Sequence, residues 1–441
     1  MTIFGTSRAR SASLYDSTRP YGMLYQLLTF FLPLRLAAFP VVEVNTATAL
    51  ELSLPDGQKF QLDPFWLRER CLSHSSVDSI TLQPLWNPHE IPLDMSFQNA
   101  SILDNNTMQV AFTDGHTSEY KVEALVKELS DFRHNPIQPL AYKRPKPVVW
   151  SGDLKLNNYD YSQVLNNEET RLQLTSDLLI LGAALVQDVP KEHGIVIEFG
   201  KNLSTLRQTE WGPFFNVRTK PDAALGAAKR DLAYTPRAIG FHTDNPYRDP
   251  TPDFQLLHAL EHCSCDKEVP CETCSVLNYL VDGFYIAEQL QMENPESFDL
   301  LSNVSVRFEN NGGDGSSALI HVSPHLELDT ADADGNKVLK SVRFSAKSGQ
   351  YAPPMDLQTT ANFYKARRRF SELAHEPKHA VTMQFKPGEI LIFDNRRVLH
   401  ARSQILPSDG ERWVQGAYID RDGLWLAFER LRRRQEQQLW E

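Results

Sequence analysis

Three residues have the types and spacing of a metal site. His242 and Asp244 stand two positions apart in the run AIGFHTDNPY, and residues two apart on a β-strand project to the same face. A distant imidazole, His400, follows the apolar run EILIF near the end of a predicted strand. Two imidazoles and one carboxylate on one face of an Fe(II) ion leave three positions open for a cosubstrate and O2. A His-x-Asp pair by itself is more often a hydrogen-bonding pair in a loop than a ligand set, so the prediction depends on the third ligand and on the arginine described next.

Arg412 lies twelve residues after His400, at the start of the predicted strand WVQGAYID. 2-Oxoglutarate would chelate the iron through its keto-acid end and leave a second carboxylate to be neutralised. A planar guanidinium can bind that carboxylate with two parallel hydrogen bonds. We therefore expect Arg412 to anchor the cosubstrate. The alternative is a surface arginine, which would be the preferred interpretation without the rest of the pattern.

Short strands separated by turns must position these residues. Residues 1–40 form a tail or a presequence, and residues 41–135 are predicted to form a small β-rich domain with hairpins at PDG and TDG. Residues 136–160 begin with a proline-rich run and are the predicted linker. We expect residues 161–441 to form the main domain, whose many short strands predict a sandwich, barrel or jelly roll. Its strand-like runs are DLLILGAALVQDV, FQLLHAL, VSVRFEN, AVTMQF and EILIFDN.

Three helices are predicted to decorate this domain, over residues 283–291, 359–375 and 422–439. The predicted fold class is therefore mainly β with decorating helices. The stretch from Met23 to Pro40 is apolar, but polar and proline residues interrupt it before it reaches a membrane-spanning length. We therefore expect no membrane partner.

Composition favours a cytoplasmic protein that acts on a small molecule. A formal net charge of −11 argues against a nucleic-acid partner, which would need a concentrated basic surface. Four of the five cysteines crowd into one short stretch, which favours a reducing compartment over a disulfide framework. The first 22 residues carry three arginines against a single acid, so a mitochondrial presequence is the alternative to a tail.

Four motifs in order resemble the γ-butyrobetaine hydroxylase and trimethyllysine dioxygenase branch of the Fe(II)/2-oxoglutarate oxygenases, which is related to taurine dioxygenase. They are HTDNPYRDPTPDFQLLHAL, LVDGFYIAEQL, FDNRRVLHAR and ERWVQGAYIDRDG. The resemblance implies a double-stranded β-helix, or jelly roll, behind a small N-terminal β domain. It also implies His242, Asp244 and His400 as iron ligands and Arg412 as the cosubstrate anchor. Thr382 matches a position that assists the same carboxylate.

Family members that act on trimethylammonium compounds hold the cation in an aromatic cage. The matching rings here are Trp211, Phe215, Tyr234 and Tyr418, and each could equally be an ordinary core residue. Asn245 replaces a ring found in some butyrobetaine enzymes, so one wall of the cage is altered. γ-Butyrobetaine is the first expectation for the substrate. Trimethyllysine, a trimethylamino phosphonate or another metabolite are the alternatives.

The cysteines raise a second metal question. Cys263, Cys265, Cys271 and Cys274 form a C-x-C and a C-x-x-C within one inserted loop, a pattern that can hold a structural zinc. Reduced surface thiols or a disulfide are the alternatives. The family's small domain usually carries a zinc on several cysteines and a histidine. The matching stretch here keeps only Cys71, so we expect that zinc to be absent.

Two other classes of protein compete with the oxygenase. A non-catalytic cupin-like binding protein could share the barrel but would have no need for the complete set of two histidines, one aspartate and Arg412. A zinc hydrolase would leave Arg412 without a role and lacks an evident general base. The expected cofactors are Fe(II), 2-oxoglutarate and O2, with ascorbate as a candidate activator, and a homodimer is compatible with the sequence.

Overall fold

A computed structural model describes residues 40–46, 48–104, 106–134, 145–219, 232–262, 276–310, 319–329, 337–345, 347–406, 409 and 412–438. The chain divides after Leu125 into two compact units. Among the described residues, no helix is both long and apolar enough to cross a bilayer. The apolar stretch from Met23 to Pro40 and the four clustered cysteines fall almost wholly outside the described residues.

The first unit contains two three-stranded antiparallel sheets. One consists of β1 (Val41–Thr46), β2 (Ala49–Ser53) and β3 (Lys59–Leu62), and the other of β4 (Phe97–Asp104), β5 (Thr107–Phe112) and β6 (Thr117–Lys121). Both predicted hairpins are present, with Gly57 and Gly115 at positive φ in their turns. Helix α1 (Pro64–Glu69) begins where the Asp63 carboxylate accepts two backbone N–H groups. The remaining elements are η1 (Pro88–Glu90) and α2 (Val122–His134).

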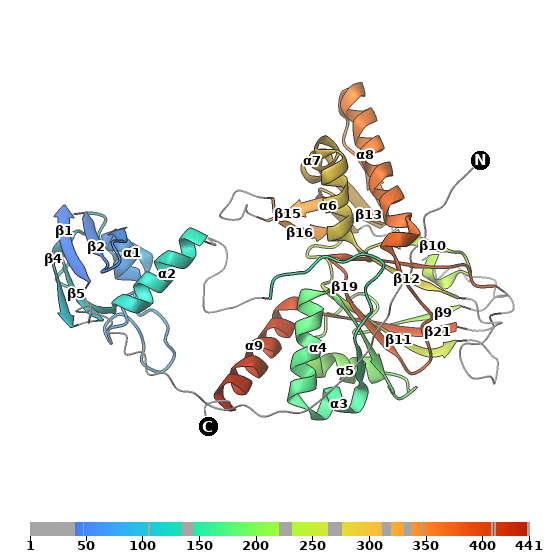
Figure 1. Ribbon diagram of the computed structural model, residues 1–441, viewed down its shortest axis with the longest axis horizontal. Helices are drawn as coiled ribbons and strands as arrows, with labels where there is room; N and C mark the ends of the chain where they lie inside the picture. Colours follow the sequence, from blue (N-terminus) through green and yellow to red (C-terminus); the bar gives the residue numbers. More distant parts are fainter. Residues whose placement is uncertain are drawn as a thin grey trace, which may run out of the picture. The chain divides into compact units, whose positions relative to one another are not determined.

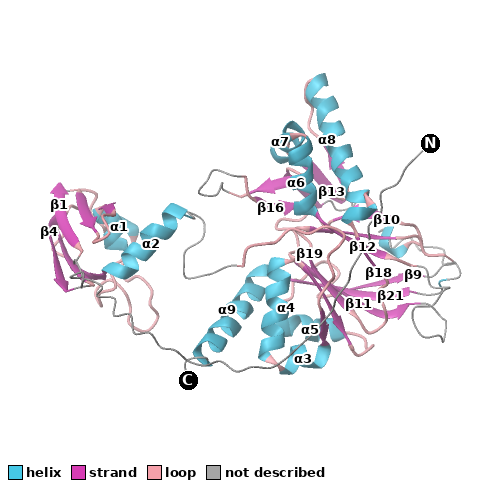
Figure 2. Cartoon of the chain, in the orientation of Figure 1, coloured by secondary structure: helices cyan, strands magenta, loops and turns pink. Residues whose placement is uncertain are grey.

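Two sheets form the centre of the second unit (Figures 1 and 2). The larger has the order β7-β8-β19-β11-β21-β9, and the smaller has the order β10-β20-β12-β18. Their strands are β7 (Asn158–Asp160), β8 (Ala183–Gln187), β9 (Phe215–Thr219), β10 (Ile239–His242), β11 (Phe254–His262), β12 (Asn278–Asp282), β18 (Val381–Met383), β19 (Ile390–Asp394), β20 (Val398–Arg402) and β21 (Arg412–Ile419). Residues 158–160, which the sequence assigns to the linker, pair with β8.

Apolar side chains from both sheets meet in one core, which includes Leu185, Leu280, Val398 and Val414. A second core lies between the six-stranded sheet and α4 (Glu168–Ile180), α5 (Ile195–Leu203) and α9 (Arg421–Gln438). A third core involves α6 (Gly283–Glu293), α7 (Pro295–Asn303) and α8 (Leu357–His375), and these two helix groups lie on opposite sides of the sheets (Figure 1). The sheets are therefore covered by helices on their outer faces and enclose a space between them.

The other elements of this unit are α3 (Tyr161–Asn166), η2 (Leu232–Tyr234), β13 (Val306–Asn310), β14 (Leu319–Ser323), β15 (Leu326–Leu328), β16 (Leu339–Val342), β17 (Gly349–Tyr351) and η3 (Pro377–His379). The three predicted helices are present as α6, α8 and α9, with ends shifted by one to two residues. The runs FQLLHAL, VSVRFEN, AVTMQF and EILIFDN each contain a strand, as predicted.

The prediction of a strand through DLLILGAALVQDV is wrong for its first half. Residues up to Ile180 belong to α4, where Leu178 and Leu179 are buried, and the strand β8 starts only at Ala183. Gly182 has φ +75° between the two elements, a conformation that permits an abrupt change of direction. A continuous apolar run does not reveal whether its period is that of a helix or a strand.

Candidate active site

The alternation of side chains along the strands directs a polar set into the space between the sheets. Val398 and Val414 belong to the shared core, so His400 and Arg412, each two positions away on the same strand, project to that same inner face. Tyr418 and Gln255 follow the same alternation on β21 and β11. The alternation along β11, β20 and β21 therefore directs Gln255, His400, Arg412 and Tyr418 to the same inner face.

His242, Asp244 and His400 are brought together. Their candidate ligand atoms all lie within 4.8 Å of one another. His242 and His400 are register partners on β10 and β20, and their ring centroids are 4.0 Å apart. The Nδ1 atom of His242 lies 2.9 Å from the carbonyl oxygen of Gly240, which leaves Nε2 for a metal. Two imidazoles and one carboxylate with this convergence fit an Fe(II) ion.

Asp244 lies just beyond the end of β10 and is held there by its surroundings. Its backbone N–H donates to the side-chain oxygen of Asn395 at 2.7 Å, and the Asn395 amide donates back to the Asp244 carbonyl. Its Oδ2 accepts from Gln255 at 2.9 Å and from the Tyr418 hydroxyl at 3.3 Å. The Nζ atom of Lys347 lies 2.8 Å from the other oxygen, Oδ1. The carboxylate is therefore fixed in orientation before any metal binds.

Charges inside the site keep Asp244 ionised. Burial by itself would raise the pKa of this carboxyl, but Lys347, His242 and His400 lower it well below its usual value. Burial is also the main reason that the pKa of His400 falls well below its usual value. A neutral imidazole and an ionised carboxylate are the protonation states that coordinate a metal. The sequence analysis grouped His242, Asp244 and His400 as a metal site but did not indicate Lys347.

Arg412 is buried, with 7 % of its surface exposed. Burial and the neighbouring charge of Arg402 lower its pKa to about 9. Its Nε atom has no hydrogen-bond partner, and Arg412 has no carboxylate partner within the described part of the chain. Arg402 is buried too and its Nε also lacks a partner, but its two terminal nitrogens donate to the carbonyls of Ala233, Thr235 and Arg237. The unmet donor and uncompensated charge of Arg412 fit a bound carboxylate such as that of 2-oxoglutarate.

Thr382 does not share this face. Its neighbour Val381 belongs to the core between the sheets, so Thr382 projects the opposite way and is exposed on β18. Asn278, on the adjacent strand β12, is buried beside its register partner Arg402, and its amide nitrogen has no partner. The sequence analysis missed Asn278. Its position two residues before the core residue Leu280 is the local signal that places it on the inner face.

Three of the predicted cage residues form a row of rings. The ring centroids of Trp211 and Phe215 are 6.3 Å apart, and those of Phe215 and Tyr418 are 5.5 Å apart. Phe215 lies across from Gly416, where a Cβ atom would collide with the ring. Asn245 donates to the Tyr418 hydroxyl at 3.0 Å. The row of rings therefore ends at Tyr418, whose hydroxyl also contacts Asp244.

The outer end of the row is more open. Trp211 is 44 % exposed, and the Arg248 guanidinium carbon lies 5.6 Å from its ring centroid. Arg248 is itself paired with Glu210. Tyr234, the fourth predicted ring, is partly buried in η2. The inner rings, Phe215 and Tyr418, are therefore the better shielded part of the candidate cage.

In the first unit, Cys71 belongs to a separate polar cluster. Its sulfur lies 3.1 Å from His116 Nε2 and 3.2 Å from the Ser73 hydroxyl. The Ser76 hydroxyl lies 3.2 Å from that of Ser73 and 3.5 Å from His116 Nε2. Serine hydroxyls are not among the usual ligands of zinc. The four clustered cysteines proposed for another zinc, Cys263, Cys265, Cys271 and Cys274, lie outside the described residues.

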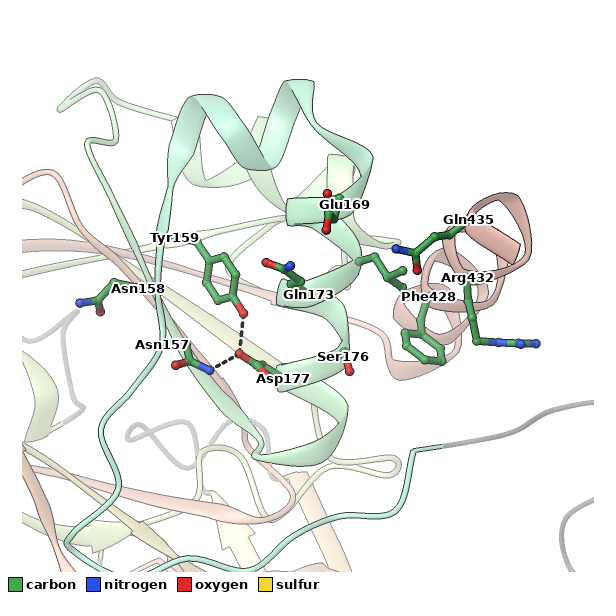
Figure 3. A pocket seen from close by; sticks show the side chains of 11 residues that line it. Asn157, Asn158, Tyr159, Glu169, Gln173, Ser176, Asp177, Phe428, Arg432 and Gln435 are labelled. Carbon is green, nitrogen blue, oxygen red and sulfur yellow. Dashed lines mark hydrogen bonds between the residues drawn. The ribbon is translucent and has the colours of Figure 1, made fainter. Parts of the chain in front are cut away.

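A groove of about 590 Å³ lies between α4 and α9 (Figure 3). Asp177 in this groove accepts from the Tyr159 hydroxyl at 2.5 Å and from the Asn157 amide at 2.6 Å. None of the predicted site residues lines it.

Comparison with known proteins shows which families the chain resembles. Residues 139–418 match the taurine catabolism dioxygenase TauD, TfdA family, and residues 43–126 match the gamma-butyrobetaine hydroxylase-like N-terminal family. Gamma-butyrobetaine dioxygenase of Pseudomonas sp. (strain AK-1) is 30 % identical over 88 % of this chain and 96 % of the relative. The mitochondrial trimethyllysine dioxygenase of Rattus norvegicus is 29 % identical over 82 % of this chain and 80 % of the relative.

Among solved structures, a taurine dioxygenase from Burkholderia xenovorans is 15 % identical and covers 63 % of this chain and 93 % of its own, with a TM-score of 0.42. The family match spans well over half of the sequence, and the first relative extends it across both units. The chain belongs to the TauD, TfdA family and is an Fe(II)- and 2-oxoglutarate-dependent dioxygenase.

Proposed function

We propose that this dioxygenase hydroxylates a small compound that carries a quaternary ammonium group, with γ-butyrobetaine as the first candidate. The observation that carries the proposal is the row of rings that leads to Asp244. A trimethylammonium group offers no hydrogen-bond donor, and ring faces attract its charge. Phe215 and Tyr418 could hold such a group close to the metal cluster while the rest of the molecule extends toward the iron.

The proposed ligands of the iron are His242, Asp244 and His400. Iron with 2-oxoglutarate and O2 supplies the oxidising chemistry. The protein's part is to fix Asp244 through Gln255 and Asn395 so that the ligands are already in place. The helix-covered sheets keep bulk water away from the reacting carbon.

Arg412 is the proposed partner of the far carboxylate of 2-oxoglutarate. Its unmet Nε and its uncompensated charge support this role. Asn278, whose buried amide nitrogen has no partner, is proposed to assist in place of Thr382. A guanidinium with two parallel donors selects a planar carboxylate better than a point charge does.

The names of the relatives support the choice of substrate class. One relative is a gamma-butyrobetaine dioxygenase and another a trimethyllysine dioxygenase. Trimethyllysine, a trimethylamino phosphonate and other metabolites are therefore the second candidates. We further propose that the two sheets are those of a double-stranded β-helix, with residues 41–135 as a separate β-rich domain. A stimulation by ascorbate, a zinc on the clustered cysteines, a homodimer and a cytoplasmic or mitochondrial location remain predictions.

A turnover screen tests the substrate proposal. The full chain with Fe(II), O2 and 2-oxoglutarate is offered γ-butyrobetaine, trimethyllysine, a trimethylamino phosphonate and the neutral tert-butyl isostere of γ-butyrobetaine, and succinate release is measured. We expect at least one quaternary amine to be hydroxylated and the isostere to be poor. Turnover of uncharged compounds alone would contradict the cage, and succinate release above background from none of the compounds would contradict all three named quaternary amines as substrates.

A variant isolates the ring contribution. Phe215→Leu keeps an apolar side chain but removes the π-face, and a cation–π contact contributes about 1 to 2 kcal/mol when desolvated. The affinity for the quaternary amine should therefore fall roughly tenfold, while that of the isostere should change little. Phe214→Leu, at the neighbouring half-buried ring that packs against the helix-side core, is the matched control. Equal losses for both ligands in Phe215→Leu would indicate a packing effect.

A further inference from the structure

Asn395 lies in the turn between β19 and β20 and holds the backbone of Asp244 from two sides. Its side-chain oxygen accepts from the Asp244 N–H at 2.7 Å, and its amide donates to the Asp244 carbonyl at 2.9 Å. The Asn395 side chain is fully buried. The orientation of Asp244 therefore depends on what keeps Asn395 in place.

The segment just before β11 fixes Asn395 through backbone carbonyls. The Asn395 N–H donates to the Asp253 carbonyl at 2.7 Å, and the Asn395 amide also donates to the Pro252 carbonyl at 3.1 Å. A side-chain amide that bonds to both this segment and Asp244 has little freedom to turn. A displacement of Asp253 would therefore reach Asp244 through a single side chain.

The Asp253 side chain joins this segment to two others. Its Oδ1 accepts from the Arg396 guanidinium at 3.1 Å, and its Oδ2 accepts from the backbone N–H of Arg421 at 3.0 Å. Arg396 follows Asn395 in the same turn, and Arg421 is the first residue of α9, where the free N–H groups of a helix start favour a carboxylate. One carboxylate therefore connects the start of β11, the turn that carries Asn395 and the start of α9.

Two carboxylates and two guanidinium groups form a chain of ion pairs at this point. The Arg421 guanidinium lies 2.6 Å from Asp394 Oδ1 and 3.5 Å from Asp253 Oδ1. Burial by itself would lower the pKa of Arg421, but Asp394 and Asp253 raise it above its usual value. Only 13 % of the Asp253 side chain is exposed, so salt and solvent screen these contacts weakly. The ion pairs therefore resist movement of Asp253 relative to the turn that carries Asn395.

We infer that Asp253 is a positioning residue that acts through Asn395 to set the orientation of Asp244 toward the metal. The inference rests on the proposed role of Asp244 as an iron ligand. Loss of an outer partner of a metal ligand typically lowers metal affinity or activity ten- to a hundredfold. Asp253 is one contact further from the ligand, so its removal should have a smaller effect.

Metal binding tests the inference without turnover. Mn(II) is titrated calorimetrically into the metal-free full chain under anaerobic conditions with 2-oxoglutarate present. Asp253→Asn keeps the shape of the side chain but removes its charge, and it should weaken Mn(II) binding about five- to tenfold. Glu293→Gln is the matched control, because Glu293 accepts two hydrogen bonds from Arg369 at 2.8 and 2.9 Å. The control should bind Mn(II) as the wild type does.

Two further measurements separate positioning from a general loss of stability. The absorption spectrum of bound Co(II) reports the geometry of its ligands, and its bands should shift in Asp253→Asn but not in Glu293→Gln. Asn395→Ala should weaken Mn(II) binding about ten- to a hundredfold. Because Asp253 is inferred to act through Asn395, adding Asp253→Asn to Asn395→Ala should weaken binding by less than about twofold more.

Several results would overturn the inference. Wild-type Mn(II) affinity and an unchanged Co(II) spectrum in Asp253→Asn would leave that residue with a structural role only. Full additivity in the double variant would exclude Asn395 as the route. Should Asp253→Asn fail to fold, Arg396→Met removes its partner instead and should weaken Mn(II) binding about threefold, and wild-type affinity there would equally contradict the inference. Undiminished Mn(II) affinity in Asp244→Ala would contradict the proposed ligand set as well.

Discussion

Two clusters of potential metal ligands, one in each unit, differ in how their polar atoms are satisfied. Cys71, Ser73 and His116 in the first unit hydrogen-bond to one another at 3.1 to 3.4 Å. His242, Asp244 and His400 in the second unit converge, but Asp244 shares its charge with Lys347, and His400 Nδ1 has no partner. The first cluster is closed by its own hydrogen bonds. In the second cluster, hydrogen bonds from Gln255 and Asn395 fix the orientation of Asp244, so that its carboxylate can bind a cation.

The difference shows that donor types alone do not make a metal site. Both clusters contain histidine and an ionisable side chain. In the first, however, serine hydroxyls form hydrogen bonds with the cysteine and the histidine, so these polar atoms have partners without a metal. In the second, Gln255 and Asn395 orient Asp244 without contacting Oδ1, the oxygen that lies 3.3 Å from His242 Nε2. Such outer partners are what separates a ligand set from a hydrogen-bonded cluster.

The largest effect should follow from removing a ligand of the second cluster. His242→Ala, Asp244→Ala or His400→Ala should each lower Fe(II)-dependent succinate formation by more than about a hundredfold, because loss of even an outer partner of a ligand typically lowers metal affinity or activity ten- to a hundredfold. Circular dichroism should show an intact fold. Cys71→Ala, the matched change in the first cluster, should leave turnover unchanged, and near-normal turnover in any of the three would remove that residue from the ligand set.

The next effect concerns Arg412, a buried charge that has no carboxylate partner among the described residues. Arg412→Lys should raise the 2-oxoglutarate concentration needed for half-maximal turnover roughly ten- to a hundredfold, since a hydrogen bond to a charged group contributes about 1.5 to 3 kcal/mol. The substrate requirement should change little. Asn278→Ala should act in the same direction more weakly and Thr382→Ala should not. Cosubstrate affinity that stays constant in Arg412→Lys would mean that another residue is the anchor.

A smaller effect is expected in the first unit. His116→Ala should destabilise that unit by about 2 kcal/mol, because it leaves the buried Cys71 sulfur without one partner. Hydrogen exchange of peptides from β5 and β6 would measure this as faster exchange. His74→Ala, an exposed position, is the control. A chelator should slow turnover without affecting this exchange, and a chelator-induced increase would reveal a metal in the first cluster.

The smallest effect is a pH dependence of the same unit. Burial raises the pKa of the Cys71 thiol, but hydrogen bonds from serine hydroxyls and His116 outweigh it and lower the pKa to about 6, from about 9. A depressed pKa stabilises the fold above the unfolded-state value and loses that contribution as the pH falls through the folded-state value. Stability should therefore decline by about 1 to 2 kcal/mol from pH 9 to pH 6, after solvent screening. Cys71→Ser should flatten this slope in hydrogen exchange, and an equal slope in the variant would assign it to other groups.

The sequence identified the residues whose roles depend on local geometry. His242 and Asp244 are two positions apart and reach one site, although Asp244 lies just beyond the end of β10. His400 and Arg412 lie on strands that the apolar pattern predicted. Helix α8 was recognisable because its apolar residues repeat with a helical period over a long run. These features depend on short-range chain geometry, which one sequence carries in full.

Only the tertiary structure decided which distant side chains surround the ligands. Gln255, Asn395 and Lys347 reach Asp244 from separate strands and loops, and no spacing along the chain connects them. The face of Thr382 depends on how β18 packs, because a one-residue change of register would reverse every side chain on a strand. The same physical cause brought Asn278 inward. Sheet packing and register are set by contacts between segments far apart in the sequence, so the partners of the ligands became visible only when the strands were in place.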